Sequence, residues 1–345
     1  MPELRSRGFD AFVATLRHRG PNFEALGSRG VPVRFVGMRS RTDVAGMVRA
    51  YRLWRLKPDV VVTSSVDAQV IGEAVALRAR ARHVTIEHAG SDLPLSPHQR
   101  LLVRLVAPWV DEVIAVSASQ LDRLRRLGFR VERTTVIPNG IPPPTPRRPR
   151  AAVRAELGVG GDDVVALLAA TLRSEKRAPR FVESVIAAHS REPRVRGVVA
   201  GGGPELELAR SAAAAAPDVV RVLGERSDVA DLIAAGDLVC LTSTSEALPL
   251  SLLEAMALGR PVLAMGVGGI VEAVADGVGG RLVAPDDFAG FVDALVALAR
   301  APGERRALGE GGRERYEERY ELARMVDRYA EVLSATVSGS ADASR

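Results

Sequence analysis

The chain has 345 residues, of which 47% are apolar and 26% charged. This composition is typical of a globular protein and excludes a disordered, collagen-like or coiled-coil chain, and the length predicts two domains at about 150 residues each. No apolar run reaches the roughly 18 residues that cross a bilayer, and residues 1–20 lack the apolar centre of a signal peptide, so we expect a cytoplasmic protein. The single cysteine, Cys240, excludes an internal disulfide and a thiolate metal cluster.

The net charge of +5 conceals a difference between the two halves of the chain. Residues 1–150 hold 25 Lys and Arg against 13 Asp and Glu, a net of +12, whereas residues 151–345 hold 22 against 29, a net of −7. A basic half suits an anionic partner such as a phosphate-bearing acceptor, an anionic membrane or a nucleic acid, and a solvated arginine-rich surface explains the balance equally well. Only two of the cations are lysines, Lys57 and Lys176.

Short β-branched runs alternate with amphipathic stretches along the first half. We predict strands over residues 9–16, 31–37, 59–63, 83–87, 113–117 and 135–137. Apolar spacings of three and four residues predict helices over 44–56, 67–80, 98–108 and 118–127. This alternation indicates a parallel sheet in a first domain over 1–141. The prolines of residues 142–150 stop the periodicity, and we place a linker there.

The second half repeats the alternation. Strands are predicted over 164–170, 195–200, 219–223, 238–241, 261–264 and 281–283, and helices over 178–189, 204–216, 227–235, 249–258, 286–300 and 303–333. The second domain then covers 151–315, followed by a C-terminal helix (316–333) and a polar tail (334–345). Since parallel sheets bind ligands at the carboxyl ends of their strands, two such α/β domains predict a ligand cleft.

Two carboxylates lie eight positions apart in the run S-T-S-E-A-L-P-L-S-L-L-E over 243–254. Glu246 follows a predicted strand, and Glu254 lies in a helix that begins near Pro249, where proline suits the first turn. The free N–H groups at such a helix start attract hydroxyl or phosphate oxygens. Two solvated glutamates beside a helix start are the alternative for a bare pair.

The 243–254 run resembles the E-x7-E signature of family-four retaining glycosyltransferases of the GT-B fold. Five more segments stand in that family's order: V-I-A-V-S (113–117), V-I-P-N-G (136–140), V-V-A-G-G-G-P-E (198–205), V-G-G-I-V-E-A-V (267–274) and D-G-V-G-G-R-L-V (276–283). The resemblance covers roughly residues 5–335. It implies an α/β protein with two Rossmann-like domains and a cleft between them, and a nucleotide-diphosphate sugar bound by the second domain.

The resemblance also implies roles for single residues. Glu254 matches the acid that accepts hydrogen bonds from the ribose hydroxyls, and Glu246 matches the residue that grips the donor hexose. Backbone N–H groups near Leu248 and Pro249 would help to orient the sugar. Lys176, in T-L-R-S-E-K-R, matches the lysine that neutralises the donor diphosphate, although a solvated lysine at a helix start is the alternative.

Other positions match less directly. The family usually has an arginine about five residues before this lysine, where this chain has Thr171, so Arg173 is the nearest substitute. Gly268 and Gly269 match the glycines that let the backbone approach the sugar phosphate, and Glu272 then falls in the next helix.

His88 follows a predicted strand end in the first domain and resembles the family's cleft histidine, although a lone histidine is more often a satisfied partner in a core. Family members open with an apolar strand and a glycine-rich loop. Here residues 4–16 already resemble the end of the next helix and the second strand. We therefore expect the first strand to be missing, or the true start to lie upstream, and the present form to be the less stable and less active one.

These features predict an enzyme that moves a hexose to an acceptor hydroxyl with retention of anomeric configuration. We expect no tightly bound metal and no cofactor besides the nucleotide-sugar co-substrate, because Lys176, Arg173 and helix N-terminal amides would stabilise the departing diphosphate. A nucleotide-sugar epimerase or phosphorylase on the same fold is an alternative. A non-catalytic basic binding protein is another, but we expect no nucleic acid as partner.

The acceptor is unknown, and the basic first domain suggests an anionic or lipid-linked one. Residues 96–110 carry an apolar stripe formed by Leu101, Leu102, Leu105, Val106 and Trp109. Two arginines, Arg100 and Arg104, lie beside it. Such a helix suits the headgroup region of an anionic membrane, so we expect peripheral contact there. Packing of the stripe against the domain's own sheet is the alternative.

Overall fold

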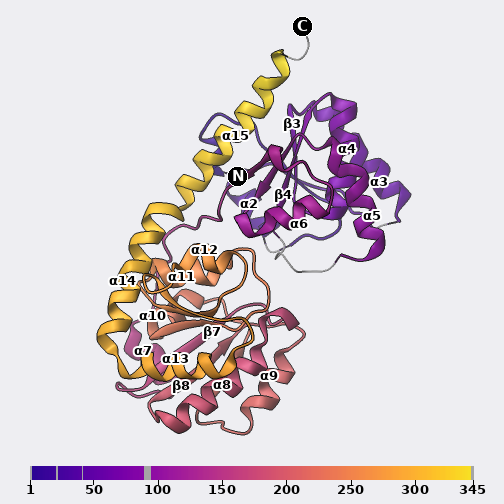
Figure 1. The fold of residues 1–345 in the computed structure, drawn as a ribbon. Helices are drawn as coiled ribbons and strands as arrows, with labels where there is room; N and C mark the ends of the chain where they lie inside the picture. Colours follow the sequence, from indigo (N-terminus) through magenta and orange to yellow (C-terminus); the bar gives the residue numbers. More distant parts are fainter. Residues whose placement is uncertain (1, 21, 41, 89–94, 343–345) are drawn as a thin grey trace. The chain divides into compact units, whose positions relative to one another are not determined.

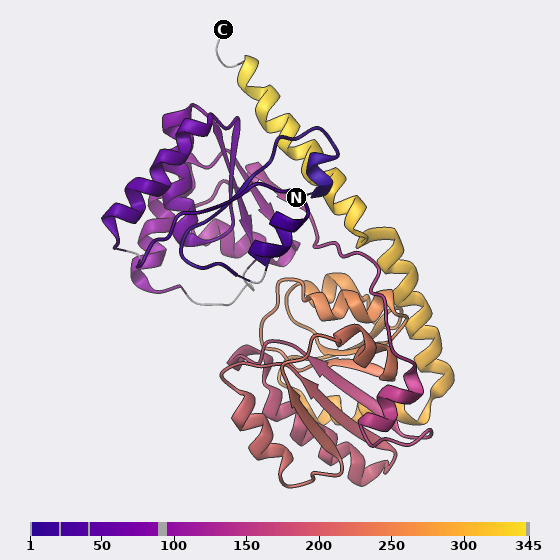
Figure 2. The same ribbon diagram turned by 180° about the vertical axis from the view of Figure 1, so that it is seen from behind.

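The computed structural model describes residues 2–20, 22–40, 42–88 and 95–342 (Figures 1 and 2). The chain forms two compact units. Unit 1 comprises Met1–Pro138 and Ala323–Arg345, and unit 2 comprises Asn139–Leu322. Each unit contains parallel strands flanked by helices, so the predicted α/β class is confirmed. Within the described ranges, no helix is long and apolar enough to cross a membrane.

Unit 2 contains a six-stranded parallel sheet with the order β12-β11-β10-β7-β8-β9. Its strands are β7 (Val164–Ala169), β8 (Val195–Ala200), β9 (Val220–Gly224), β10 (Leu238–Leu241), β11 (Val262–Met265) and β12 (Gly280–Val283). Every residue of β7, β10 and β11 is buried, as expected for apolar strands covered by helices on both faces. The chain runs outward from β7 to β9 and then returns to β10. The carboxyl ends of β7 and β10 therefore form the point at which strand order reverses, where open α/β sheets bind ligands.

Helices cover both faces of this sheet (Figure 1). One face carries α8 (Ala178–Arg191), α9 (Leu206–Ala213) and α13 (Phe288–Arg300). The other carries α7 (Arg150–Glu156), α10 (Val229–Ala235), α11 (Leu250–Ala257) and α12 (Gly269–Val274). α14 (Pro302–Arg319) packs against α11.

Unit 1 contains a two-stranded and a four-stranded parallel sheet. The strands are β1 (Val13–Thr15) and β2 (Val33–Phe35) in the first, and β3 (Val60–Thr63), β4 (Arg82–Glu87), β5 (Glu112–Ala115) and β6 (Thr134–Val136) in the second. The helices are α1 (Pro2–Arg5), α2 (Asn22–Ser28), α3 (Val44–Tyr51), α4 (Val66–Ala79), α5 (Pro97–Val106), α6 (Leu121–Arg126) and α15 (Leu322–Asp342). Side chains alternate across β5: Val113 faces α5 and α6, whereas Ile114 packs with Leu333 of α15.

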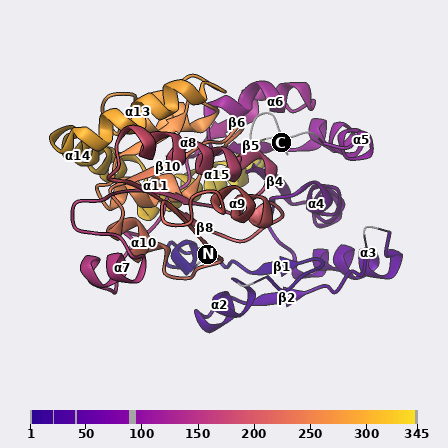
Figure 3. The same ribbon diagram turned by 90° about the horizontal axis from the view of Figure 1, so that it is seen from below.

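The two sheets of unit 1 are separate in the described part of the chain (Figure 3). β1 pairs with β2 and β3 pairs with β4, so β1 and β3 each have one edge without a partner strand there. The hydroxyl of Thr15 at the end of β1 is buried without a hydrogen-bond partner.

The C-terminal region differs from the prediction of one helix over 303–333 and a polar tail. α14 ends at Arg319, because the chain leaves helical geometry at Tyr320 and pairs there with Ile141. The N–H of Ile141 donates to Tyr320 O, and the N–H of Leu322 donates to Ile141 O, both at 3.0 Å. α15 then continues to Asp342, so residues 334–342 of the expected tail are helical. The buried side chain of Leu333, packed in unit 1, holds this helix on the sheet.

The proline-rich residues predicted as a linker belong to unit 2. The backbone N–H groups of Arg147 and Arg148 donate to Asp231 Oδ1 at 2.5 and 3.1 Å, and the Arg150 guanidinium binds Asp237 at 2.7 Å. The division between units falls after Pro138 instead. Residues 150–156, partly inside the expected linker, form α7.

Candidate functional site

The loops that follow β7 and β10 lie side by side in unit 2. The two strands are adjacent, with Leu238 opposite Ala166, so their carboxyl ends coincide at one edge of the sheet. Thr244 N–H donates to Glu175 O at 2.8 Å, and the Thr242 hydroxyl donates to Lys176 O at 2.9 Å. These bonds fix the loop after β7 against the loop after β10.

The structure brings two of the predicted residues, Lys176 and Glu246, into direct contact. Lys176 Nζ lies 2.5 Å from Glu246 Oε1, and the hydroxyl of Ser243 donates to the same oxygen at 2.7 Å. The side chains of Lys176 and Glu246 are only 17% and 7% exposed. A carboxylate this buried requires a counter-charge and hydrogen-bond donors. Lys176 supplies the counter-charge and one donor, and Ser243 supplies a second donor.

The backbone of Glu246 is held from the other side by the glycine pair. Gly268 has φ +51° and ψ −136°, and a Cβ added there would lie 1.9 Å from Glu246 O. Gly269 N–H donates to the same carbonyl at 3.3 Å. Only glycine allows this approach, so the glycine pair positions the Glu246 loop. Glu272 lies in α12, half-buried, and its backbone carbonyl accepts a hydrogen bond from Arg315 at 2.7 Å.

A glycine-rich loop after β8 supports the loop that carries Lys176. Gly201 and Gly203 have φ values of +149° and +140°, and added Cβ atoms would lie 1.7 Å from Ala170 O and 2.6 Å from Leu172 O. The two loops are therefore packed backbone to backbone. Arg173 is exposed in the supported loop, three residues before Lys176.

Leu248 and Glu254 follow Glu246 in the 243–254 run. Glu254 is half-buried in α11, and desolvation raises the pKa of its carboxyl above the ordinary 4.5. Leu248 is buried just before Pro249, the residue that precedes α11, and its carbonyl accepts a hydrogen bond from the side-chain amide of Asn139 at 3.0 Å. The site thus depends on Asn139, for which the sequence suggested no role.

The raised pKa of Glu254 predicts how stability depends on pH. Below about pH 4.5 the carboxyl is protonated in both the folded and the unfolded chain, and above its folded pKa burial opposes the charge. We expect Glu254→Gln to raise the melting temperature at pH 7 and the gain to shrink as the pH falls towards 4.5. Thermal unfolding of both proteins across pH 4–8 measures this. A gain that grows at low pH would show that Glu254 is stabilised as a charged group.

His88 belongs to unit 1, where it follows β4 and is exposed. The His88 side chain therefore reaches solvent, although its surroundings desolvate the ring and lower the pKa of His88 below its ordinary value. A satisfied core histidine is found at His83 instead, which is buried, with Nε2 2.9 Å from the Thr63 hydroxyl and Nδ1 2.6 Å from Glu73.

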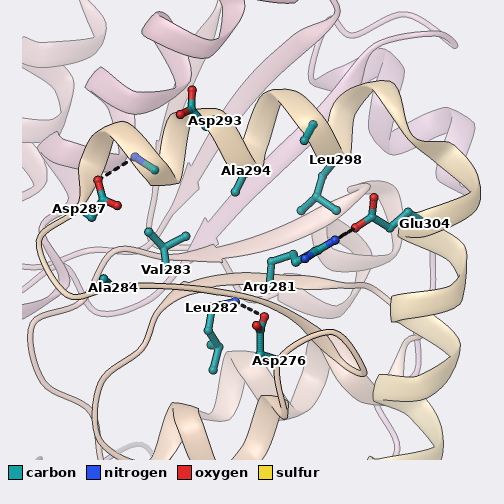
Figure 4. Close-up of a pocket in the computed structure, with 12 residues that line it drawn as sticks. Asp276, Arg281, Leu282, Val283, Ala284, Asp287, Asp293, Ala294, Leu298 and Glu304 are labelled. Carbon is teal, nitrogen blue, oxygen red and sulfur yellow. Dashed lines mark hydrogen bonds and ion pairs between the residues drawn. The ribbon is translucent and has the colours of Figure 1, made fainter.

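A cavity of about 510 Å³ lies elsewhere in unit 2, between β12 and α13 (Figure 4). None of the predicted donor-binding residues lines it. Its rim holds four carboxylates (Asp276, Asp287, Asp293 and Glu304) and one guanidinium, Arg281, which is paired with Glu304 at 2.6 Å. This excess of negative charge repels a diphosphate, so we do not assign the donor to this cavity.

Two family models match most of the chain. The model for Glycosyltransferase Family 4 matches residues 1–143, and the model for Glycosyl transferases group 1 matches residues 163–301. The chain belongs to the family-four glycosyltransferases. The second match covers both loops of the Lys176–Glu246 site and the glycine pair.

Curated relatives and solved structures are similar to this chain. It is 36% identical over 202 residues to D-inositol 3-phosphate glycosyltransferase of Saccharomonospora viridis (54% of this chain, 47% of the relative). It is 29% identical over 269 residues to N-acetyl-alpha-D-glucosaminyl L-malate synthase of Bacillus anthracis (76% and 68%). The chain thus spans about half the length of the first relative.

Two solved structures share the GT-B fold. Anabaena HepE in complex with UDP superimposes with a TM-score of 0.84 at 22% identity, covering 97% of this chain and 94% of that one. Sucrose-phosphate synthase of Thermosynechococcus elongatus gives 0.76 at 21% identity, covering 87% and 80%. At these identities the likeness shows the fold.

Proposed function

We propose that this glycosyltransferase moves a hexose from a nucleotide-diphosphate sugar to an acceptor hydroxyl with retention of anomeric configuration. The contact between Lys176 and Glu246 at the carboxyl ends of β7 and β10 is the observation that carries the proposal. A cation and a buried carboxylate meet there, shortly before the start of α11. The solved complex of HepE with UDP-glucose supports a donor of this class.

The donor diphosphate would bind at Lys176. An ammonium group has three N–H donors, and one is used by Glu246, so the others remain for phosphate oxygens. Arg173, exposed in the same loop, would supply a second cation. The first free N–H groups of α11, after Pro249, would add a partial positive charge to the same region.

The hexose and the ribose of the donor would bind to the two glutamates of the 243–254 run. Among the described residues, both contacts to the Glu246 carboxylate fall on Oε1, and Oε2 would accept hydrogen bonds from hexose hydroxyls. Glu254 would accept from the ribose hydroxyls, which requires its ionised form. Because burial raises the pKa of Glu254, donor binding should strengthen as the pH rises through that value.

In the transfer step, the acceptor oxygen forms a bond to the anomeric carbon on the face from which the diphosphate leaves. The bond from that carbon to the diphosphate oxygen breaks, and its electron pair stays on the diphosphate. The hydroxyl proton passes to the departing diphosphate oxygen. Lys176 and Arg173 stabilise the negative charge that develops there, which is the work that a metal ion does in other transferases, so we propose a metal-independent reaction.

The acceptor side belongs to unit 1 in this proposal. His88, exposed after β4, would contact the bound acceptor, and the basic character of residues 1–138 favours an anionic or lipid-linked acceptor.

A donor screen tests the function. We expect one of the UDP-, GDP- or ADP-sugars to raise the melting temperature and to be turned over with EDTA present, and the product to keep the donor's anomeric configuration by NMR. An inverted product or a requirement for added metal would contradict the mechanism. Conversion of the nucleotide-sugar to an isomer without any acceptor would favour an epimerase.

A further inference from the structure

α5 and the turn that follows it carry apolar side chains on two opposite sides. The inward side packs against β5 and α6 and consists of Val103, Val106 and Ala107. The outward side consists of Leu101, Leu105 and Trp109, which are 57%, 61% and 69% exposed. At about 100° per residue, Leu101 and Leu105 lie opposite the buried side chains. These three outward residues, the α5 stripe, are therefore not part of the core.

Positive charge borders the α5 stripe. Arg100 and Arg104 are exposed beside it, and residues 97–109 contain no acidic residue. The Arg104 guanidinium also contacts the carbonyl of Arg126 in α6, at 3.4 Å, so the basic α6 lies next to the helix. The nearby carboxylate of Asp122 is neutralised by Arg125 at 2.6 Å.

We propose that the α5 stripe docks unit 1 on an anionic lipid bilayer. Leu101, Leu105 and Trp109 would enter the boundary between headgroups and acyl chains, where an indole ring is well accommodated. Arg100 and Arg104 would reach lipid phosphates while their methylene stems cover the apolar surface. Residues 1–138, which belong to unit 1, hold 22 Lys and Arg against 13 Asp and Glu, and this net charge of +9 favours such a surface over a neutral one. No donor-binding residue lies in α5, so this contact can fail while the transfer reaction stands.

Vesicle sedimentation of the full chain tests the proposal. We expect binding to vesicles of phosphatidylcholine with phosphatidylglycerol, little binding to phosphatidylcholine alone, and weaker binding in high salt. Arg100→Glu with Arg104→Glu should reduce the partition coefficient on anionic vesicles by about 30-fold or more, since each basic residue near such a surface contributes about 1 kcal/mol. The matched control is Arg306→Glu with Arg313→Glu, two exposed arginines of α14 in unit 2, which should change it much less.

The apolar contribution is tested separately. Replacing Leu101, Leu105 and Trp109 together by serine should lower the partition coefficient at least about ten-fold, because the apolar area that enters the bilayer is lost. Leu77→Ser with Leu208→Ser is the control, since these leucines are 75% and 58% exposed on other helices. An unchanged melting temperature and far-UV circular dichroism spectrum of the serine variant would verify that its fold is intact.

Trp109 also provides a direct signal. The only other tryptophan, Trp54, lies under the guanidinium of Arg78 at 4.0 Å and can be replaced by phenylalanine. In Trp54→Phe, anionic vesicles should shift the Trp109 emission to the blue. The proposal is overturned if that emission does not move, if binding ignores lipid charge, or if the serine variant binds like the unsubstituted chain. It is also overturned if the serine substitutions abolish self-association and no vesicle binding occurs, because a second copy then covers the stripe.

Discussion

Lys176→Ala should lower kcat for transfer by about 100-fold or more and weaken donor binding by about ten-fold or more. The substitution removes the cation that we propose to stabilise the departing diphosphate, a type of interaction that strengthens in the transition state. It also leaves the buried carboxylate of Glu246 with the Ser243 hydroxyl as its remaining bonded partner in the described part of the chain, so we expect a loss of roughly 3 kcal/mol in the free energy of unfolding. Steady-state kinetics, nucleotide titration and thermal unfolding measure the three effects.

Two controls separate the chemical role of Lys176 from a structural one. Lys57→Ala removes the only other lysine, which is exposed in unit 1, and should leave kcat unchanged. The double variant Lys176→Met with Glu246→Gln removes both charges, so the melting temperature should recover while kcat stays low. Recovery of kcat together with stability would show that the pair only holds the loops together.

Gly268→Ala should destabilise unit 2 by about 3 kcal/mol or more. The new Cβ would lie 1.9 Å from Glu246 O, and the backbone at φ +51° and ψ −136° already disfavours any other residue. Relief requires movement of the Glu246 loop, so donor affinity should fall even at temperatures where the variant is folded. Chemical denaturation and nucleotide titration check both effects.

Gly277→Ala provides the comparison for this variant. Gly277 has φ +78° in the same unit, but nothing lies within 4 Å of an added Cβ. This substitution carries only the conformational cost, about 1–2 kcal/mol, and should leave donor affinity unchanged. Equal losses in the two variants would contradict the argument that Gly268 positions Glu246.

The sequence predicts the strands of both units well, because apolar β-branched runs separated by helical spacing leave few alternatives. The helix end expected from residue 4 corresponds to α1, but α2 escapes prediction, since its seven residues carry no clear period. The break at Tyr320 was missed for a different reason: it depends on pairing with Ile141, nearly 180 residues away.

The candidate site was predicted in part. The motif identifies Lys176 and Glu246, but their mutual contact follows from the adjacency of β7 and β10, which the sequence alone does not show. Ser243 lies in the 243–254 run and Asn139 in V-I-P-N-G, but the sequence does not show that they bond to Glu246 and Leu248, because the packing of the loops brings them together. A small polar run directly after a buried strand is the signal that could have pointed to Ser243.

Similarly, the apolar pattern of residues 96–110 could not separate inward from outward side chains. The alternative of core packing holds for Val106, which is buried, whereas Leu101, Leu105 and Trp109 face solvent. Leu102 is half-buried. The distinction requires the position of α5 on its sheet, because leucine and valine at helical spacing suit both environments.

Hydrogen exchange with and without UDP, GDP or ADP tests most directly the claim that the donor binds where β7 and β10 end. We expect one of these nucleotides to slow amide exchange in residues 171–177 and 243–254 and in the loop around Gly268. Protection confined to β12 and α13, around the acidic cavity, or no protection by any of the three nucleotides, would contradict it.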